Sequence, residues 1–305
     1  MPSNIPVITP AQSLEAYQDC VNPVIDVGGL LAVVPELVAM ASSGEINASS
    51  EQRAQLKFLS AHLAAIPLGT VDQLNNCPAE DWAVDSCINT GEPVVLPAYN
   101  CSGGTGAGTV GFKRGGPESP MLYPWFPFRL FGAGRKNLWS PLSAPLSLAR
   151  ANQLGRATWK ARNIYGGDWD QGLLNAVLTQ QPIDEQAAML LQRARGGFSS
   201  SFRFPFATGD CSGSGVNSEL GAINANALQW MIAQDGANGE IVMFPSGWPA
   251  GWDLSFKLHT QNATTVSGRC SGGKLRDFVV RPAWRASDVS FGAGGAGCSP
   301  AADGG

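Results

Sequence analysis

The hydrophobic period of this 305-residue chain changes close to Asp235. Before that point, apolar residues in several segments recur every three to four positions, which is the spacing of amphipathic helices. After it, apolar and polar residues alternate in short runs separated by Asn-Gly, Ser-Gly and Gly-Gly, which is typical of an antiparallel sheet. The sequence therefore predicts a mainly α region followed by a small antiparallel β-sheet domain.

Six segments have helical spacing, and the first two are expected to form an antiparallel pair. They span residues 23–40 (interrupted at Pro35), 49–66, about 144–164, 170–180, 184–195 and 218–234. Ser49 or Ser50 is expected to cap the second helix, with Glu51 in its first turn. The predicted strands are 240–244, 252–259, 264–269 and 274–280.

Composition sets the expected boundaries between parts of the chain. Residues 67–120 are rich in Gly, Pro, Asn, Thr and Cys, which predicts a long structured loop. Residues 1–236 form the predicted helical part and residues 237–290 the predicted β-rich domain. Residues 291–305 are so rich in glycine that we expect a flexible tail.

Charge and hydropathy exclude several classes of partner. With 20 Lys and Arg against 24 Asp and Glu, the net charge is −4, and no basic run or clustered arginine face is evident, so no nucleic-acid partner is expected. The apolar runs at residues 30–34 and 241–244 are too short for a membrane span, so none is expected.

GGTGAG at 103–108 follows no strand and opens no helix, so no nucleotide cofactor is expected. The first ten residues lack the features of a secretory signal, so export would be encoded upstream.

The seven cysteines favour disulfides over a metal site. They form no CxxC pair, and with only two histidines we expect neither zinc nor another metal. Cys77, Cys87 and Cys101 share one loop-rich stretch, which a disulfide would rigidify. Glycosylation sequons begin at Asn47, Asn100 and Asn262, which also favours a secreted or extracellular protein. The alternative is a cytosolic protein with reduced, buried cysteines.

Four runs in order carry a resemblance to a known family: PESPMLYPWFPFRLFGAG, DWDQGLLNAV, FRFPFATGD and the segment from NALQWMIAQDG through FPSGWPAGWDLSFKLH to the following hairpin. In this order they resemble six-hairpin (α/α-toroid) glycosidase-like proteins and, more distantly, α-L-fucosidase-type glycoside hydrolases. The resemblance implies the C-terminal part of an (α/α)6 toroid that binds an oligosaccharide or polysaccharide. It also implies that a missing N-terminal half, or a partner chain, covers the helices.

Inverting hydrolysis needs a general acid and a general base on opposite sides of the sugar. The resemblance places Glu219 where fucosidase-type enzymes have the Asp linked to water activation, and a helix start would keep this carboxylate ionised. An ordinary first-turn glutamate is the alternative. The sequence departs from the family in having Glu instead of Asp, within Ser-Glu-Leu-Gly. No residue inherits the general acid; Asp210 is a possible substitute, or a turn residue.

Further side chains are candidates for binding the sugar, with core packing as the alternative for the aromatic residues. They are Glu118, Tyr123, Trp125, Arg129, Trp169, Asp170 and Asn217. Trp248 and Trp252 either join them or pack the sheet onto the helices. The resemblance, with these residues as candidates, implies a glycoside hydrolase-like protein, inverting if active. The alternatives are a carbohydrate-binding or structural protein that has lost the general acid, and an intracellular interaction protein, which the cysteines and sequons disfavour.

Overall fold

The computed structural model describes residues 5–13, 17–74, 90–104, 119–141, 143–162, 171–194, 218–292 and 297–300. Contacts divide the chain into two compact units. The N-terminal unit comprises residues 1–132 and 136–165, and the C-terminal unit comprises residues 133–135 and 166–305. The division does not follow the expected boundary at residue 236, because the helices after residue 170 belong to the same unit as the C-terminal strands.

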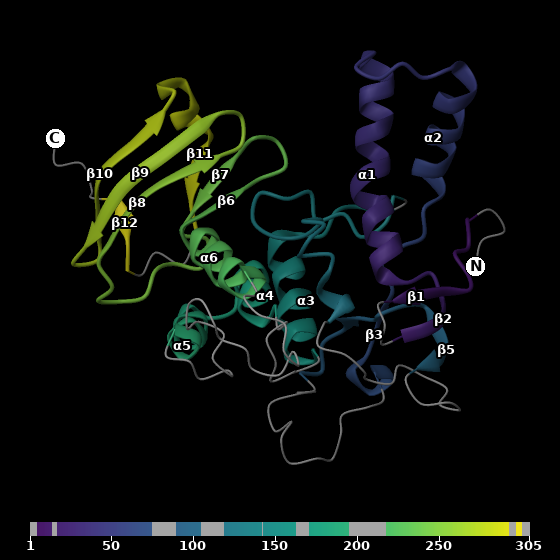
Figure 1. Cartoon of the computed structure of the whole chain (residues 1–305), viewed down its shortest axis with the longest axis horizontal. Helices are drawn as coiled ribbons and strands as arrows, with labels where there is room; N and C mark the ends of the chain where they lie inside the picture. The colour runs from purple at the N-terminus through teal and green to yellow at the C-terminus, as the bar shows by residue number, and fades with distance from the viewer. Residues whose placement is uncertain are drawn as a thin grey trace. The chain divides into compact units, whose positions relative to one another are not determined.

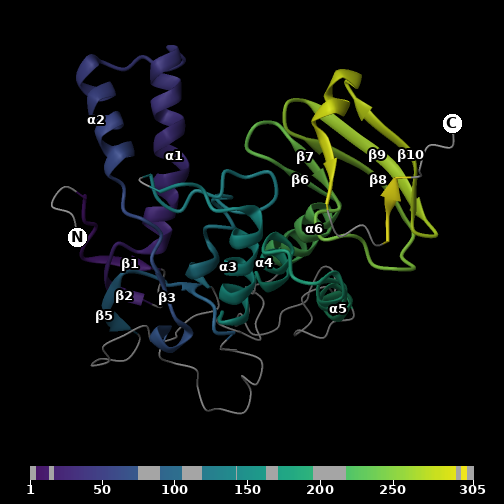
Figure 2. The same cartoon turned by 180° about the vertical axis from the view of Figure 1, so that it is seen from behind.

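A helix pair dominates the N-terminal unit, as expected. Helices α1 (Val24–Ser43) and α2 (Ser50–His62) contact each other and lie side by side in Figures 1 and 2. The Ser49 side chain accepts a hydrogen bond from the Gln52 amide (3.1 Å), while the Gln52 side chain accepts one from the Ser49 amide (2.8 Å). This capping box fixes the start of α2 at the predicted position. Helix α1 continues through Pro35 instead of breaking there.

Two small sheets, which the sequence did not predict, complete this unit together with α3 (Leu148–Lys160). The first contains β1 (Ala11–Ser13), β2 (Tyr17–Val21) and β5 (Asn100–Gly104), all antiparallel. The second pairs β3 (Leu68–Gly69) with β4 (Val94–Val95). Short 3-10 helices lie at η1 (Val71–Leu74) and η3 (Pro120–Leu122).

A disulfide joins Cys20 on β2 to Cys101 on β5, which are opposite each other in the sheet register. The expectation that Cys101 closes a local loop is wrong, because its partner lies 81 residues away in sequence. Cys77 and Cys87 lie outside the described residues. The disulfide therefore connects the two ends of a long segment rather than stiffening a short one.

The C-terminal unit contains helices α4 (Gly172–Leu178), α5 (Ile183–Ala194) and α6 (Ser218–Ile232). Every residue of α4 is buried, and α4 contacts both α5 and α6. Helix α6 leads directly into β6 (Ala233–Asp235), which forms a three-stranded sheet with β7 (Ile241–Met243) and β11 (Val289–Phe291). The predicted strand at 240–244 thus joins a sheet separate from the later hairpin.

The second sheet of this unit is four-stranded, in the order β12-β10-β9-β8. Its strands are β8 (Leu254–Thr260), β9 (Thr264–Ser271), β10 (Lys274–Arg281) and β12 (Ser299–Pro300), with the 3-10 helix η4 (Ala283–Asp288) following β10. Strands β8, β9 and β10 are antiparallel neighbours, as predicted.

The described part of the expected flexible tail is fixed to this sheet. Strand β12 pairs in parallel with β10, and Cys298 forms a disulfide with Cys270 on β9. A Cβ atom added at Gly297 would overlap the Trp248 carbonyl oxygen, and the backbone there has φ +96°. Only glycine permits so close an approach. Packing and covalent linkage therefore compensate for the low hydrophobicity of this segment.

The prediction of a mainly α chain with part of an (α/α)6 toroid is wrong. The described residues form four small sheets, and strands occur in both units. Helix α3, which a toroid would pair with another helix, packs mainly on β4 and η3. The N-terminal strands have two to five residues, so their alternation is too brief to show in the sequence.

Helix α1 is long and apolar enough to cross a membrane, contrary to the expectation that no stretch reaches this length. A third of its most apolar window (33%) is buried in the fold. The core helix of a folded domain or a signal sequence passes the same test of length and composition. Here α1 contacts α2, η3 and β1.

Asp26, in the first turn of α1, gives the N-terminal unit a predicted pH dependence. Burial raises the pKa of this half-buried carboxyl above its ordinary value of 3.8. The folded chain therefore binds the proton more tightly than the unfolded chain, so stability falls as pH rises from about 3.8 through the folded pKa. We expect Asp26→Asn to remove this fall and to stabilise the unit at pH 7 by less than about 1 kcal/mol, since solvent screens the exposed part of the group.

The measurement is the urea midpoint of the wild type and of the Asp26→Asn variant at intervals from pH 3 to pH 7. Glu51→Gln is a suitable control, because Glu51 also lies in a first helical turn but is exposed. An Asp26→Asn variant that loses more stability at pH 7 than at pH 4 would contradict the prediction.

Candidate functional site

The aromatic run after η3 is the first predicted sugar-binding segment that the structure describes. Backbone hydrogen bonds fold it into successive turns: the Trp125 amide donates to Leu122 O (2.9 Å), and the Leu130 amide donates to Pro124 O (2.8 Å). A Cβ atom added at Gly28 of α1 would lie 2.8 Å from the Phe128 ring. The run is thus packed tightly against α1.

Trp125 lies in the core of the N-terminal unit rather than on its surface. Its side chain is completely buried (0% exposed), with the Phe131 ring centroid 5.0 Å away. A Cβ atom at Gly155 of α3 would lie 3.0 Å from the indole, so the glycine provides the room that the ring occupies. With its faces covered, this ring has no surface on which a sugar can stack. The core-packing interpretation applies to Trp125.

Tyr123 and Arg129 are the other two predicted binding residues with described side chains. Both are partly exposed, and Tyr123 packs edge-on against Phe128 at 5.9 Å between ring centroids. Arg129 has a left-handed backbone (φ 51°), which is uncommon for a residue with a side chain. These two residues lie on either side of Trp125 in the sequence and remain candidates for contact with a ligand.

Glu219 is the only predicted catalytic residue whose backbone the structure describes. It is the second residue of α6 (Ser218–Ile232), so its backbone lies in the first turn of a 15-residue helix, as expected. The dipole of such a helix favours the ionised form of a first-turn carboxylate. Its side chain, and the whole of Glu118, Trp169, Asp170, Asp210 and Asn217, lie outside the described residues. Their predicted roles stay predictions.

The FPSGWPAGWD element forms an aromatic cluster inside the C-terminal unit. Trp248 is 2% exposed and packs edge-on against Phe244 and Trp252, at 6.0 Å between centroids in each case. Its indole N–H donates to the Trp252 carbonyl oxygen (2.9 Å). Phe244 also contacts Phe256 of β8. Of the two predicted alternatives, the structure supports core packing for Trp248.

A polar cluster at the β6–β7 turn escaped the sequence analysis. Burial lowers the pKa of Arg135, while the nearby charges of Asp235 and Glu240 raise it. The Asp235 carboxylate accepts a hydrogen bond from the Gln261 amide (3.1 Å), and the Gln261 side chain donates to Gly236 O (2.8 Å). The cluster attaches residues 133–135 to the turn, so its charges have structural partners. The sequence did not predict this cluster, because Arg135 is far in sequence from Asp235 and Glu240.

Buried amide side chains are concentrated around α4 and α6. Gln186 donates to Gln181 O (2.6 Å), and Gln181 donates to Thr179 Oγ1 (3.0 Å). The side-chain oxygens of Asn175, Gln181 and Gln186, and both polar atoms of Asn224, are buried without a hydrogen-bond partner among the described residues. Because such groups are costly in a protein interior, these positions are suited to bound water or to hydroxyl groups.

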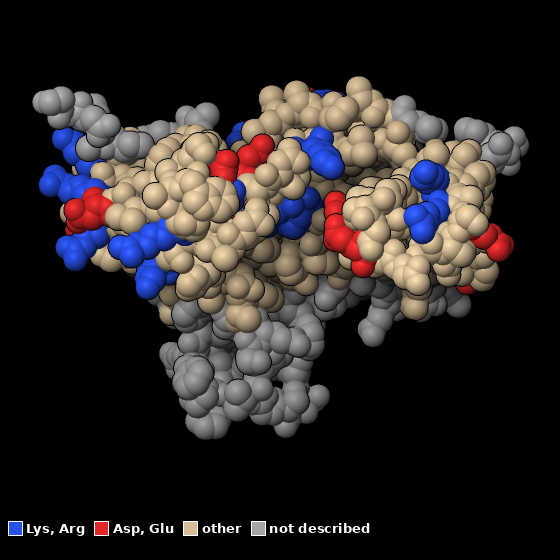
Figure 3. Space-filling view, turned by 90° about the horizontal axis from the view of Figure 1, so that it is seen from above, with Lys and Arg blue, Asp and Glu red and all other residues tan. Residues whose placement is uncertain are grey.

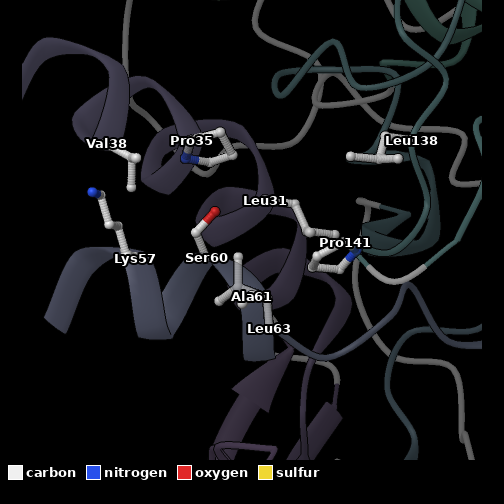
Figure 4. A pocket seen from close by; sticks show the side chains of 9 residues that line it. All are labelled: Leu31, Pro35, Val38, Lys57, Ser60, Ala61, Leu63, Leu138 and Pro141. Atoms are coloured by element: carbon white, nitrogen blue, oxygen red, sulfur yellow. The ribbon is translucent and has the colours of Figure 1, made fainter. Parts of the chain in front are cut away.

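A cavity of about 410 Å³ lies between α1, α2 and residues 138–141 of the N-terminal unit. Figure 4 shows its lining side chains, which are mostly apolar: Leu31, Pro35, Val38, Lys57, Ser60, Ala61, Leu63, Leu138 and Pro141. It contains no carboxylate and few hydrogen-bonding groups among these described residues. This lining suits an aliphatic group and lacks the acid and base that glycoside hydrolysis requires.

Comparison with known proteins does not identify the chain. No protein-family model matches the sequence, and no curated protein matches it significantly.

Proposed function

We propose that this chain is a glycoside hydrolase-like protein that binds carbohydrate outside the cytosol. If the chain hydrolyses the bound carbohydrate, Glu219 is the general base. The proposal rests on the sequence between residues 218 and 281 and does not require a toroid. The apolar cavity between α1 and α2 has no part in it.

The order of elements from α6 to β10 is the observation that carries the proposal. Helix α6 leads into β6 (Ala233–Asp235), which contains the Gln and Asp of the expected Gln-Asp-Gly turn, and β7, the FPSGWPAGWD element and the β8–β9 hairpin follow. Apart from β6, this is the succession on which the resemblance to glycosidase-like proteins depends. It supports the alignment that assigns Glu219 to the start of the helix and, with it, the role of water activation.

Disulfides and sequons support the location. Cys20 pairs with Cys101 and Cys270 with Cys298, so all four cysteines in the described part of the chain form disulfides. Such bonds persist in oxidising compartments. The sequon residues Asn47, Asn100 and Asn262 all have exposed side chains, as glycan attachment requires.

Glu219→Gln is the variant that tests the base. We expect it to lower kcat by about a hundredfold on an aryl glycoside or oligosaccharide that the wild type hydrolyses, because the amide cannot accept the proton of the attacking water. The dissociation constant of the oligosaccharide, measured by calorimetry, should stay within about twofold. The matched control is Glu51→Gln, which removes a first-turn carboxylate from the exposed helix α2.

Three other outcomes are informative. Unchanged turnover in Glu219→Gln would remove this residue as the base. Oligosaccharide binding by the wild type without turnover would favour the non-catalytic alternative. A wild-type chain that neither binds nor cleaves any member of a broad glycan panel would contradict the proposed function.

A further inference from the structure

One face of the β8–β9–β10 sheet gathers the basic residues of these strands. The register aligns Ser255, Arg269 and Arg276 across the three strands, then Lys257, Ser267 and Val279, then His259, Thr265 and Arg281. Lys274 lies opposite Ser271 on the same side. Alternate residues of β8 and β9 share a face, and a register shift between Arg276 and Val279 places Val279 and Arg281 of β10 opposite residues of that same face, so these rows lie on one side of the sheet. We call its five cationic residues the basic face: Lys257, Arg269, Lys274, Arg276 and Arg281.

The basic face is the solvent side of the sheet. The residues that alternate with it, such as Phe256, Val266 and Leu275, are buried, whereas all five cationic residues are exposed. In Figure 3, Lys and Arg side chains gather at the left end of the view, with a smaller acidic patch among them. The face extends about 20 Å along β9, from Thr265 to Ser271.

The charges of the basic face are not neutralised by ion pairs in the described part of the chain. Arg269 and Arg276 are directly opposite each other on neighbouring strands, an arrangement that is destabilising for like charges. Residues 254–281 contain these five cations and only one carboxylate, Asp277, in a chain of net charge −4. The expectation that the chain has no clustered arginine face is therefore wrong.

We propose that the basic face binds an acidic polysaccharide, whose carboxylate or sulfate groups would neutralise the facing arginines. Spaced cations match a polymer with repeated negative charges, and their mutual repulsion is relieved when it binds. Ser255, Ser267 and Thr265 lie between the cations and supply hydroxyl groups that can hydrogen-bond to sugar hydroxyls. The charge pattern of the basic face does not depend on the proposed function, whereas the choice of a polysaccharide as the ligand rests on it.

The composition of the face favours a polysaccharide over other polyanions. Sheets that bind single-stranded nucleic acid present aromatic rings on which bases stack. In the rows of this face the only ring belongs to His259, whose Nδ1 lies 3.2 Å from Thr265 Oγ1. Val279 is the one apolar residue in these rows, so the face offers little for insertion into a lipid bilayer.

The test uses the full chain with polygalacturonate, neutral dextran and duplex DNA as probes at low salt. The variant Arg269→Gln with Arg276→Gln should bind polygalacturonate about tenfold more weakly than the wild type, and wild-type binding should weaken as salt is added. The control, Lys57→Gln with Lys136→Gln, removes two exposed cations elsewhere and should bind within about twofold of the wild type. If the double arginine variant does not fold, Lys257→Gln with Arg281→Gln replaces it.

Equal binding of polygalacturonate and dextran by the wild type would overturn the proposal, as would full binding by the arginine variant. Tighter binding of duplex DNA than of polygalacturonate would overturn the assignment to a polysaccharide. The Glu219→Gln variant should bind polygalacturonate like the wild type. Failure of the basic face is thereby distinguishable from failure of the proposed glycosidase-like activity, which is read from neutral oligosaccharides.

Discussion

Replacing both Cys20 and Cys101 with alanine in one variant is expected to lower the free energy of unfolding of the N-terminal unit by about 4 kcal/mol. The disulfide closes a segment of 81 residues, so it removes much conformational freedom from the unfolded chain. Both sulfur-bearing side chains are buried, at 0% and 1% exposure, between β2 and β5. Without the bond, strands of five residues each must hold this sheet together.

Urea denaturation followed by hydrogen exchange of peptides from each unit measures this loss, since it reports the two units separately. The matched control replaces Cys270 and Cys298 in the C-terminal unit, where the bond spans only 28 residues. Its effect should be smaller and should appear in the peptides of β9. Free thiols at Cys20 and Cys101 in the untreated protein, or an unchanged urea midpoint, would show that this bond does not stabilise the fold.

Trp125→Ala is expected to destabilise the N-terminal unit by about 4 kcal/mol. The substitution empties the space between Phe131 and Gly155, and a rigid core closes only partly around such a cavity. Thermal and urea unfolding measure the loss. Binding of oligosaccharide, measured well below the unfolding temperature, should change little, because this ring is not exposed to a ligand.

The control for Trp125 is Trp284→Ala. The Trp284 side chain is 69% exposed on η4, so its removal should change stability by less than about 0.5 kcal/mol. If Trp125→Ala instead folded with wild-type stability and lost carbohydrate binding, the predicted role of Trp125 as a sugar-stacking residue would be restored.

The local structure of this chain was largely predictable. Helices α1 to α6 lie at the segments with helical spacing, and the strands β7 to β10 lie at the alternating runs. Ser49 caps α2 as expected, because a side-chain oxygen at that position satisfies an amide that the helix leaves unpaired. Such features depend on residues a few positions apart, so one sequence contains the information.

The candidate site was less predictable. The spacing of aromatic residues cannot distinguish a tryptophan that binds sugar from one that fills a core, and Trp125 and Trp248 both proved to be buried. The Arg135 cluster was missed because its members are about 100 residues apart. The cations of the basic face are also scattered between residues 257 and 281, although the strand alternation that aligns them was visible.

The sequence by itself determined where the helices and C-terminal strands form, because hydrophobic period, capping and turn residues act over short distances. Only the tertiary structure decided the fold class, since the short strands β2 and β3 pair with β5 and β4 across long stretches of sequence. It also decided which cysteines pair and which basic residues share a face. Sheet register brings Arg269 opposite Arg276, and it is this pairing that concentrates positive charge on a chain whose net charge is negative.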